Sequence, residues 1–400
     1  MITTTQWWAF LLFSPIVYWL LPAKWRAGVL ALMSFCLLMV YAPLDIAVLA
    51  VIATLVFGVH HAPADGPKPL AFFSRLAASP MLLMLILAYF FWAKYLPAFS
   101  LIFTLQASVL DLVIPLGISY FTFKLLHYSI EKNRGTLPEH SYVDFASYMF
   151  LAPIFTAGPI ERFEHYIEHR ATKFEIDFVF EGLLRIAQGL VKKFVFGLIV
   201  LELLQRSPGG DTFELVEKID TLTPLQIWAT LSLTSLYIYL DFAAYSDIAI
   251  GSSRLFGLRI MENFNLPFMS KSLREFWQRY HMTLASWVLT YIYMPAVART
   301  RNPFAAIVIS FGVVGLWHAA WPAHWFLWGL WHGIGLAILL WWTRLFQKRR
   351  SKFLRKKPVQ FLGWAITMLF VILGDTFPAL YGHGTILDAF AIMLAAIGLN

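Results

Sequence analysis

The sequence predicts an all-α polytopic membrane protein, on the strength of two observations. Of its 400 residues, 59% are hydrophobic and only 14% are charged, whereas soluble domains contain about 25% charged residues. The hydrophobic residues also gather into long apolar runs that recur from one end of the chain to the other. Together these features favour a bundle of membrane helices over a soluble domain.

The apolar runs mark the expected helices. Several are shorter than the roughly 20 residues that cross a bilayer as a straight helix. We therefore expect tilted, broken or re-entrant segments, whose backbone must be covered by protein or line a cavity. The runs are 7–21, 27–41, 45–59, 81–95, 183–204, 225–242, 304–317, 325–342, 360–373 and 384–399.

Basic residues between the runs predict the topology. The stretch QKRRSKFLRKK at 347–357 is expected to be a cytoplasmic loop, because such loops are rich in Lys and Arg. Lys24 and Arg26 follow the first run and mark another such loop, while Lys68 and Arg75 fit the next. The N-terminus is therefore expected outside. This topology explains the net charge of +8 better than nucleic-acid binding, which requires a basic polar surface.

The chain is expected to form a single domain over residues 1–400. Its first run lacks the basic start and the small-residue cleavage site of a signal peptide, so it is expected to remain as a span. Residues 1–106 hold the N-terminal spans, 107–335 hold the polar motifs, and 336–400 hold the C-terminal spans with the basic loop.

Ionisable residues interrupt the apolar sequence between 107 and 335. Asp241 and Asp247 lie in YLDFAAYSDIAIG, 239–251. At membrane depth such groups are costly to bury and usually mark a pathway or a site. Further along, TAGPIERFEHY is expected to break its helix at Gly158–Pro159, because the residue before a proline avoids helical geometry.

A second polar stretch, SLREFWQRYHMTLASW at 272–287, alternates charged and aromatic residues. Glu275, Arg279 and His281 lie here. Trp277 and His281 are four residues apart, which predicts that they share one face of a helix. His281 could orient a substrate or donate to a developing oxyanion. A buried hydrogen bond between neighbouring helices is the structural alternative.

The segment GLWHAAWPAHWFLWGLWHG, 315–333, repeats Gly-Leu-Trp-His and contains His318, His324 and His332. Pro322 is expected to end or kink the helix that leads to His318. A buried imidazole is expected to be uncharged near pH 7, because desolvation disfavours its charged form. His318, beside Trp317, could then take a proton from a hydroxyl that attacks a thioester or ester. A core histidine bonded to a carbonyl is the alternative, and packing is the expected role of His324 and His332.

Other chemistries lack their sequence signatures. The histidine segment contains neither a carboxylate nor an HExxH or Cys/His spacing, so we expect no metal site. The chain also has no GxSxG elbow and no glycine-rich nucleotide loop. No bound cofactor is therefore expected.

Four blocks of the sequence, matched together and in order, resemble the membrane-bound O-acyltransferase (MBOAT) family. The resemblance is strongest to its bacterial branch, which serves alginate O-acetylation and teichoic-acid D-alanylation. The blocks are PLGISYFTFKLLHYSIEKNRG (115–135), TAGPIERF (156–163), YLDFAAYSDIAIGSSRLFGLRIMENFNLPFMSKSLREFWQRYHMTLASW (239–287) and GLWHAAW (315–321).

This resemblance implies a ring of transmembrane and re-entrant helices around a central tunnel. An acyl thioester, acetyl-CoA or an acyl carrier protein, would enter from the cytoplasm, and the acceptor from outside. By motif position, His318 corresponds to the family's catalytic histidine and His281 to its second characteristic histidine. Asp241, Asp247, Glu275 and Arg279 are expected to support the tunnel, together with Trp277 and Trp317.

Two positions depart from the family pattern and bear on the substrate. Ala319 stands where members commonly have glycine, and its methyl group predicts a short acyl chain. Leu289 and Thr290 stand where members often have Arg-Asp. The expected activity is transfer of acetyl to a cell-surface polysaccharide or a periplasmic relay partner, in a bacterial inner membrane. D-alanyl transfer is the alternative, and a lipid-linked sugar flippase or an inert scaffold subunit are the rivals from other classes.

Overall fold

The computed structural model describes residues 2–63, 67–104, 114–319, 323–345 and 356–399, and these residues form two compact units. Of the described residues, those up to 189 and 245–261 belong to unit 1, and those in 190–244 and from 262 onward belong to unit 2. The described residues are almost entirely helical, with one isolated bridge between Arg170 and Leu258. The predicted all-α class is confirmed, whereas the single-domain organisation stays a prediction.

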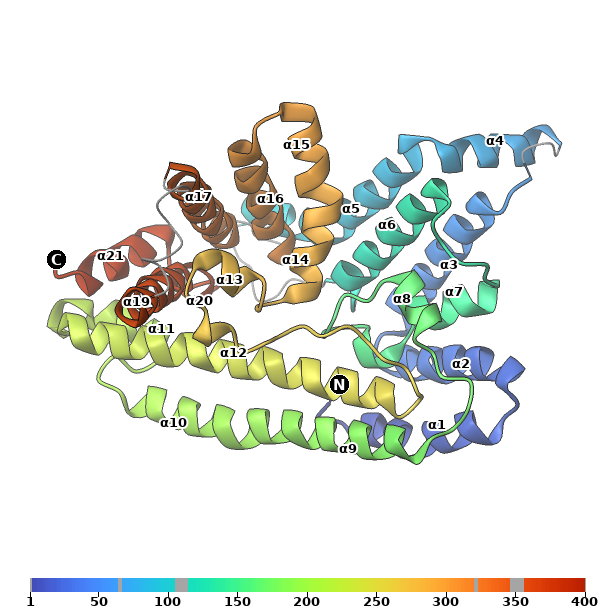
Figure 1. Ribbon diagram of the computed structural model, residues 1–400, viewed down its shortest axis with the longest axis horizontal. Helices are drawn as coiled ribbons and strands as arrows, with labels where there is room; N and C mark the ends of the chain where they lie inside the picture. The colour runs from blue at the N-terminus through green and yellow to red at the C-terminus, as the bar shows by residue number, and fades with distance from the viewer. Residues whose placement is uncertain (1, 64–66, 105–113, 320–322, 346–355, 400) are drawn as a thin grey trace. The chain divides into compact units, whose positions relative to one another are not determined.

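Unit 1 holds the N-terminal helices and the first polar motifs (Figure 1). Its helices are α1 (Thr5–Leu20), α2 (Ala23–Tyr41), α3 (Pro43–His60), α4 (Lys68–Ala78), α5 (Pro80–Thr104), α6 (Ile118–Arg134), α7 (Tyr142–Met149), α8 (Phe163–Glu168) and α9 (Ile176–Val191). The last ten residues of α12 (Pro224–Arg254) also belong to it.

Unit 2 holds the two π-helical turns and the histidine motifs. Its elements are η3 (Lys192–Gly197), α10 (Leu198–Arg206), α11 (Thr212–Lys218), the start of α12, α13 (Leu273–Trp277), α14 (Met282–Val288), η6 (Leu289–Tyr293), α15 (Met294–Thr300), α16 (Pro303–His318), α17 (Ala323–Leu345), α19 (Lys357–Gly374), α20 (Thr376–Ala379) and α21 (Ile386–Ala396).

The hydropathy pattern predicted the helices correctly. Each apolar run lies in α1, α2, α3, α5, α9–α10, α12, α16, α17, α19 or α21, except that 7–21 extends one residue past α1 and 384–399 extends up to three residues past the ends of α21. Among the described residues, five helices are long and apolar enough to cross a membrane. A sixth candidate bends by 76° between Ala71–Ala78 and Pro80–Leu96, which is the broken geometry that the short runs predicted. Most of the basic loop at 347–357 lies outside the described residues.

Glycine explains the close packing of α16 and α17, which form a helical hairpin (Figure 1). A Cβ atom on Gly315 would lie 2.3 Å from the Trp325 carbonyl oxygen, and one on Gly329 would lie 2.3 Å from the Phe311 oxygen. Small residues allow such approach between membrane helices. The repeated Gly-Leu-Trp-His therefore has a packing cause, because the glycine of each copy lies at the α16–α17 crossing.

Replacing Gly329 by alanine should therefore force α16 and α17 apart. Overpacking of this kind destabilises by roughly 1–3 kcal/mol, and we expect a lower thermal midpoint for the detergent-purified variant. Gly58→Ala in α3 is the matched control, because its added methyl group would meet nothing within 4 Å. An equal midpoint for the two variants would show that the crossing tolerates a methyl group.

Candidate active site

His318 is the last residue of α16, at the turn of the α16–α17 hairpin. Pro322, expected to end this helix, lies outside the described residues, but the helix does end at His318. The imidazole is half-buried. It stacks on Trp325, with ring centroids 4.4 Å apart and planes 21° from parallel, and meets Trp328 edge to face at 5.3 Å.

Trp317 precedes His318 and lies against the same imidazole, at 4.7 Å between ring centroids. Three indoles thus contact His318, one from α16 and two from the first turns of α17. An apolar aromatic wall of this kind limits water around the ring and restricts its rotation. The arrangement suits a general base that must stay uncharged until it takes a proton.

His281 lies at a different point in the fold, as the N-cap of α14. Its backbone is left-handed, with φ 46°, which is uncommon for a non-glycine residue. The side chain is buried, and its Nδ1 lies 3.0 Å from Asn263 Oδ1, which also accepts a hydrogen bond from Thr283 Oγ1 at 2.9 Å. Because Asn263 Oδ1 is an acceptor, His281 Nδ1 donates and Nε2 keeps the lone pair.

The predicted helical face shared by Trp277 and His281 is wrong. Helix α13 ends at Trp277, and residues 278–280 form a turn before His281 begins α14. The left-handed backbone of His281 cannot continue an α-helix, which separates the two side chains. His281 packs edge to face against Phe242 at 4.8 Å.

Trp277 instead joins an aromatic cluster between α13, α16 and α17. Its ring centroid lies 5.6 Å from Trp328, 4.9 Å from Phe311 and 5.1 Å from His332. His332 is only 1% exposed, and His324 is also buried. Trp328 therefore contacts both Trp277 and His318. The Trp328 ring thus lies between Trp277, a predicted support residue, and His318, the candidate base.

The two aspartates of α12 each form an ion pair with a neighbouring helix. Asp241 pairs with Lys193 in η3, within unit 2. Asp247 is buried and lies 2.8 Å from Arg185 Nε in α9, within unit 1. The two aspartates thus connect α12 to η3 and to α9, respectively.

Glu275 and Arg279 pair with each other at 2.8 Å, four residues apart, and each side chain is about one-third exposed. The Glu275 backbone amide also donates to the Ser272 hydroxyl that caps α13. This pair lies within the turn around α13 and stabilises it. A role in holding tunnel helices in register stays a prediction for these two residues.

In unit 1, Gly158–Pro159 lies in an irregular break between η2 (Ala152–Ile154) and α8, but the pair does not end a helix as predicted, because α7 already ends at Met149. Gly158 has φ 109°, and a Cβ atom there would lie 2.9 Å from the Ala249 methyl carbon of α12. Just beyond it, the buried Glu161 carboxylate accepts from the Met261 amide at 2.8 Å and pairs with His165 Nδ1 at 2.6 Å. This hydrogen bond to Glu161 raises the pKa of His165 above its usual value.

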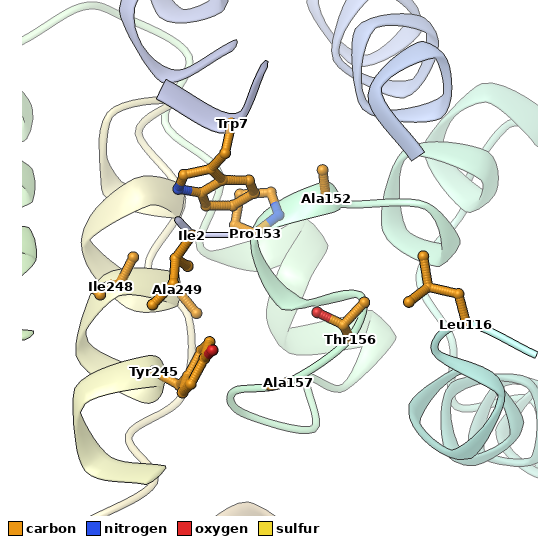
Figure 2. A pocket seen from close by; sticks show the side chains of 10 residues that line it. All are labelled: Ile2, Trp7, Leu116, Ala152, Pro153, Thr156, Ala157, Tyr245, Ile248 and Ala249. Carbon is orange, nitrogen blue, oxygen red and sulfur yellow. The ribbon is translucent and has the colours of Figure 1, made fainter. Parts of the chain in front are cut away.

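A cavity of about 230 Å³ lies beside this break, wholly within unit 1. Figure 2 shows Tyr245, Ile248 and Ala249 of α12 on one side, facing the segment that carries Thr156 and Ala157. Ile2, Trp7, Leu116, Ala152 and Pro153 complete the lining. The TAGPIERF block thus contributes to a cavity wall as well as to the buried Glu161 network.

Comparison with known proteins supports the family resemblance that the sequence motifs indicated. A model of MBOAT, the membrane-bound O-acyltransferase family, matches residues 76–379, which is more than half of the chain. The chain belongs to the membrane-bound O-acyltransferase family. Each block that carried the resemblance lies within the matched region, His281 and His318 included.

Several curated relatives are named for acyl transfer to alginate, teichoic acid or peptidoglycan. A probable alginate O-acetylase of Pseudomonas aeruginosa is 31% identical over 72% of this chain and 54% of its own length. A teichoic acid D-alanyltransferase of Streptococcus thermophilus is 32% identical over 57% of each chain. A peptidoglycan O-acetyltransferase of Helicobacter pylori is 26% identical over 76% of this chain and 61% of its own length. The chain spans about half the length of the alginate O-acetylases it matches.

The two departures from the MBOAT pattern have different surroundings. Ala319 is buried, has extended backbone and directly follows the candidate base. Leu289 begins the π-helical turn η6 and is 52% exposed. The Thr290 hydroxyl donates to the Ser286 carbonyl oxygen at 2.9 Å, within its own helix. The Ala319 methyl group is therefore the departure placed to affect the chemistry at His318.

Sequence reasoning missed four residues that contact or pair with the predicted ones. Trp325 and Asn263 contact the two histidines, while Lys193 and Arg185 pair with the two aspartates. Lys193 and Arg185 left a signal, since each is a cation inside the apolar run 183–204. Asn263 left none, because it lies in an irregular segment 18 residues before the histidine it orients.

Proposed function

We propose that this MBOAT protein transfers an acyl group from a cytoplasmic thioester across the membrane to a hydroxyl. The acceptor is a cell-surface polysaccharide or a periplasmic partner that relays the group to one. The observation that carries the proposal is His318, held by Trp325 and Trp328 at the end of α16, in the family's histidine motif. The names of the relatives, acetylases and D-alanyltransferases, support the same reaction class.

In the proposed reaction, a ring nitrogen of His318 takes the proton of the acceptor hydroxyl as its oxygen attacks the thioester carbonyl carbon. The new C–O bond forms and gives a tetrahedral intermediate. Its collapse restores the carbonyl group and breaks the C–S bond. The imidazolium then gives its proton to the leaving thiolate, so that ester and thiol are released and His318 is again uncharged. The donor, acetyl-CoA or an acyl carrier protein, is a substrate, and no bound cofactor takes part.

His281 acts in this scheme by positioning a reactant through its Nε2 lone pair, whereas stabilising the oxyanion, the other predicted role, would require a protonated ring. Its hydrogen bond to Asn263 fixes the ring orientation and the tautomer. The ion pairs of Asp241 and Asp247 hold α12 against its neighbouring helix. The tunnel that would connect the two compartments belongs to the proposal, as do the bacterial inner membrane and the external N-terminus, which rest on the basic loops.

Acetyl is the proposed acyl group. The alginate and peptidoglycan relatives are acetylases by name, and the buried Ala319 methyl group beside His318 favours a short chain. D-alanyl is the second candidate, because teichoic acid D-alanyltransferases match the chain at similar identity. Efficient transfer of a long fatty acyl group by the purified protein would contradict this size limit.

A deletion strain tests the function against the flippase and scaffold alternatives. Mass spectrometry of the surface glycans should show loss of acetyl groups in the deletion strain, with the polymer itself still exported. The wild-type gene should restore the acetyl groups, and a His318→Ala gene should not, at equal membrane abundance. Loss of the polymer from the surface would favour a flippase, and full restoration by His318→Ala would favour a scaffold.

A further inference from the structure

Trp325 stacks on His318, and this contact can affect the reaction. The role of Trp325 in that reaction rests on the proposed function. The ring planes are 21° from parallel at 4.4 Å, so the π face of Trp325 covers the face of the imidazole. Trp328 stands at 90° to the imidazole at 5.3 Å. Of these two α17 indoles, only Trp325 lies face to face with the histidine.

A face-to-face indole interacts differently with the two forms of the imidazole. With the uncharged ring the contact is mainly dispersion. When His318 takes the hydroxyl proton, a positive charge develops directly over the indole face, and the cation–π attraction is added. An interaction that is stronger in the transition state than in the ground state accelerates the chemical step.

The hairpin segment itself suggests why an aromatic ring takes this role. In Ser-His-Asp enzymes, a carboxylate stabilises the imidazolium that forms during the reaction. Residues 315–333, which carry His318, contain no Asp or Glu, but they contain five tryptophans. Tryptophan is the side chain that binds cations best through its π face.

We propose that Trp325 is a positioning residue that holds the His318 ring in place and stabilises its imidazolium form during acyl transfer. Because His318 and Trp325 are both half-buried, the expected effect on rate lies between about 5-fold and an upper limit of about 30-fold, which is about 1 to 2 kcal/mol at 1.36 kcal/mol per tenfold. The effect falls on kcat, because the uncharged resting histidine gains little from the indole's charge distribution. Binding of the thioester is expected to be unaffected.

Fluorinated tryptophans at position 325 test this directly, because ring fluorines weaken the cation–π attraction with little change of shape. Incorporating analogues with one to four fluorines should lower log kcat in proportion to the loss of cation affinity, with KM for the donor unchanged. Trp325→Phe should retain more activity than Trp325→Leu, whose loss should lie between about 5-fold and about 30-fold. The same analogues at Trp341, which lies on α17 and is 53% exposed, should leave kcat unchanged.

An unchanged kcat across the fluorinated Trp325 series would overturn the inference, and so would a change confined to KM. The fluorinated proteins keep the indole, so the result is independent of whether Trp325→Leu folds. His318→Gln in the same assay distinguishes failure of the proposed function, in which His318 is the base, from failure of the role of Trp325. If His318→Gln transfers normally, the proposed role of His318 as the base fails, and the role of Trp325 fails with it; if His318→Gln is inactive while kcat is unchanged across the fluorine series, only the role of Trp325 fails.

Discussion

Replacing His318 by glutamine is expected to lower acyl transfer by up to about 10⁴-fold, the upper range for loss of a general base. Glutamine keeps a polar group of similar reach but cannot accept the hydroxyl proton at neutral pH. The aromatic wall of Trp325 and Trp328 belongs to α17 and should stay in place. Purified protein in nanodiscs, given a radiolabelled acyl thioester and a soluble acceptor, provides the measurement.

Two controls make this result specific. Donor binding, followed by equilibrium dialysis with a non-hydrolysable thioester analogue, should survive in His318→Gln. His324→Gln changes another buried histidine of the same hairpin, and it should transfer at close to the wild-type rate. Equal loss in both variants would mean that the hairpin fold, and not the base, had been tested.

Replacing His281 by alanine should leave a residual rate about 10²- to 10³-fold below wild type. Losing a group that positions a reactant costs from about 10²-fold upward, because a shift of about 1 Å already has that effect. Asn263→Leu should cost less, because it removes the group that orients the ring at 3.0 Å but leaves the imidazole itself. Initial rates of both variants in the nanodisc assay, beside their thermal midpoints, check this order.

A complete loss of transfer in His281→Ala, with an unchanged thermal midpoint, would contradict a positioning role. The lone pair that the hydrogen bond to Asn263 leaves on Nε2 would then make His281 a base in its own right. Activity equal to wild type would instead assign His281 to the structural alternative, a buried hydrogen bond that links two segments.

The helices could be predicted because hydropathy alone determines them in a membrane. Each apolar run became a helix, since an apolar backbone must satisfy its hydrogen bonds internally. The turn between Trp277 and His281 could not be predicted, because periodicity assumes a regular backbone and His281 adopts φ 46°. That one left-handed residue directs the two side chains to different neighbours, Phe242 for His281 and Trp328 for Trp277.

The candidate site was only partly visible in the sequence. His318 and His281 were found through their motifs, which lie in continuous stretches of chain. Asn263 and Trp325 could not be found in this way, because only the fold brings them to the histidines. Asn263 hydrogen-bonds to His281, 18 residues further along the chain, and Trp325 meets His318 where α16 and α17 pack together. The glycines that permit this crossing were visible only as a repeated Gly-Leu-Trp-His, whose packing cause needed coordinates.

The central claim is that reagents from both compartments reach residue 318. The chain has a single cysteine, Cys36, so a Cys36→Ala background allows His318→Cys to be probed alone. In sealed vesicles of defined orientation, a small membrane-impermeant thiol reagent should modify this cysteine from either side, and the acyl thioester should protect it from the cytoplasmic side. No modification from either side, with cysteines placed in the exposed loops fully labelled, would contradict the account.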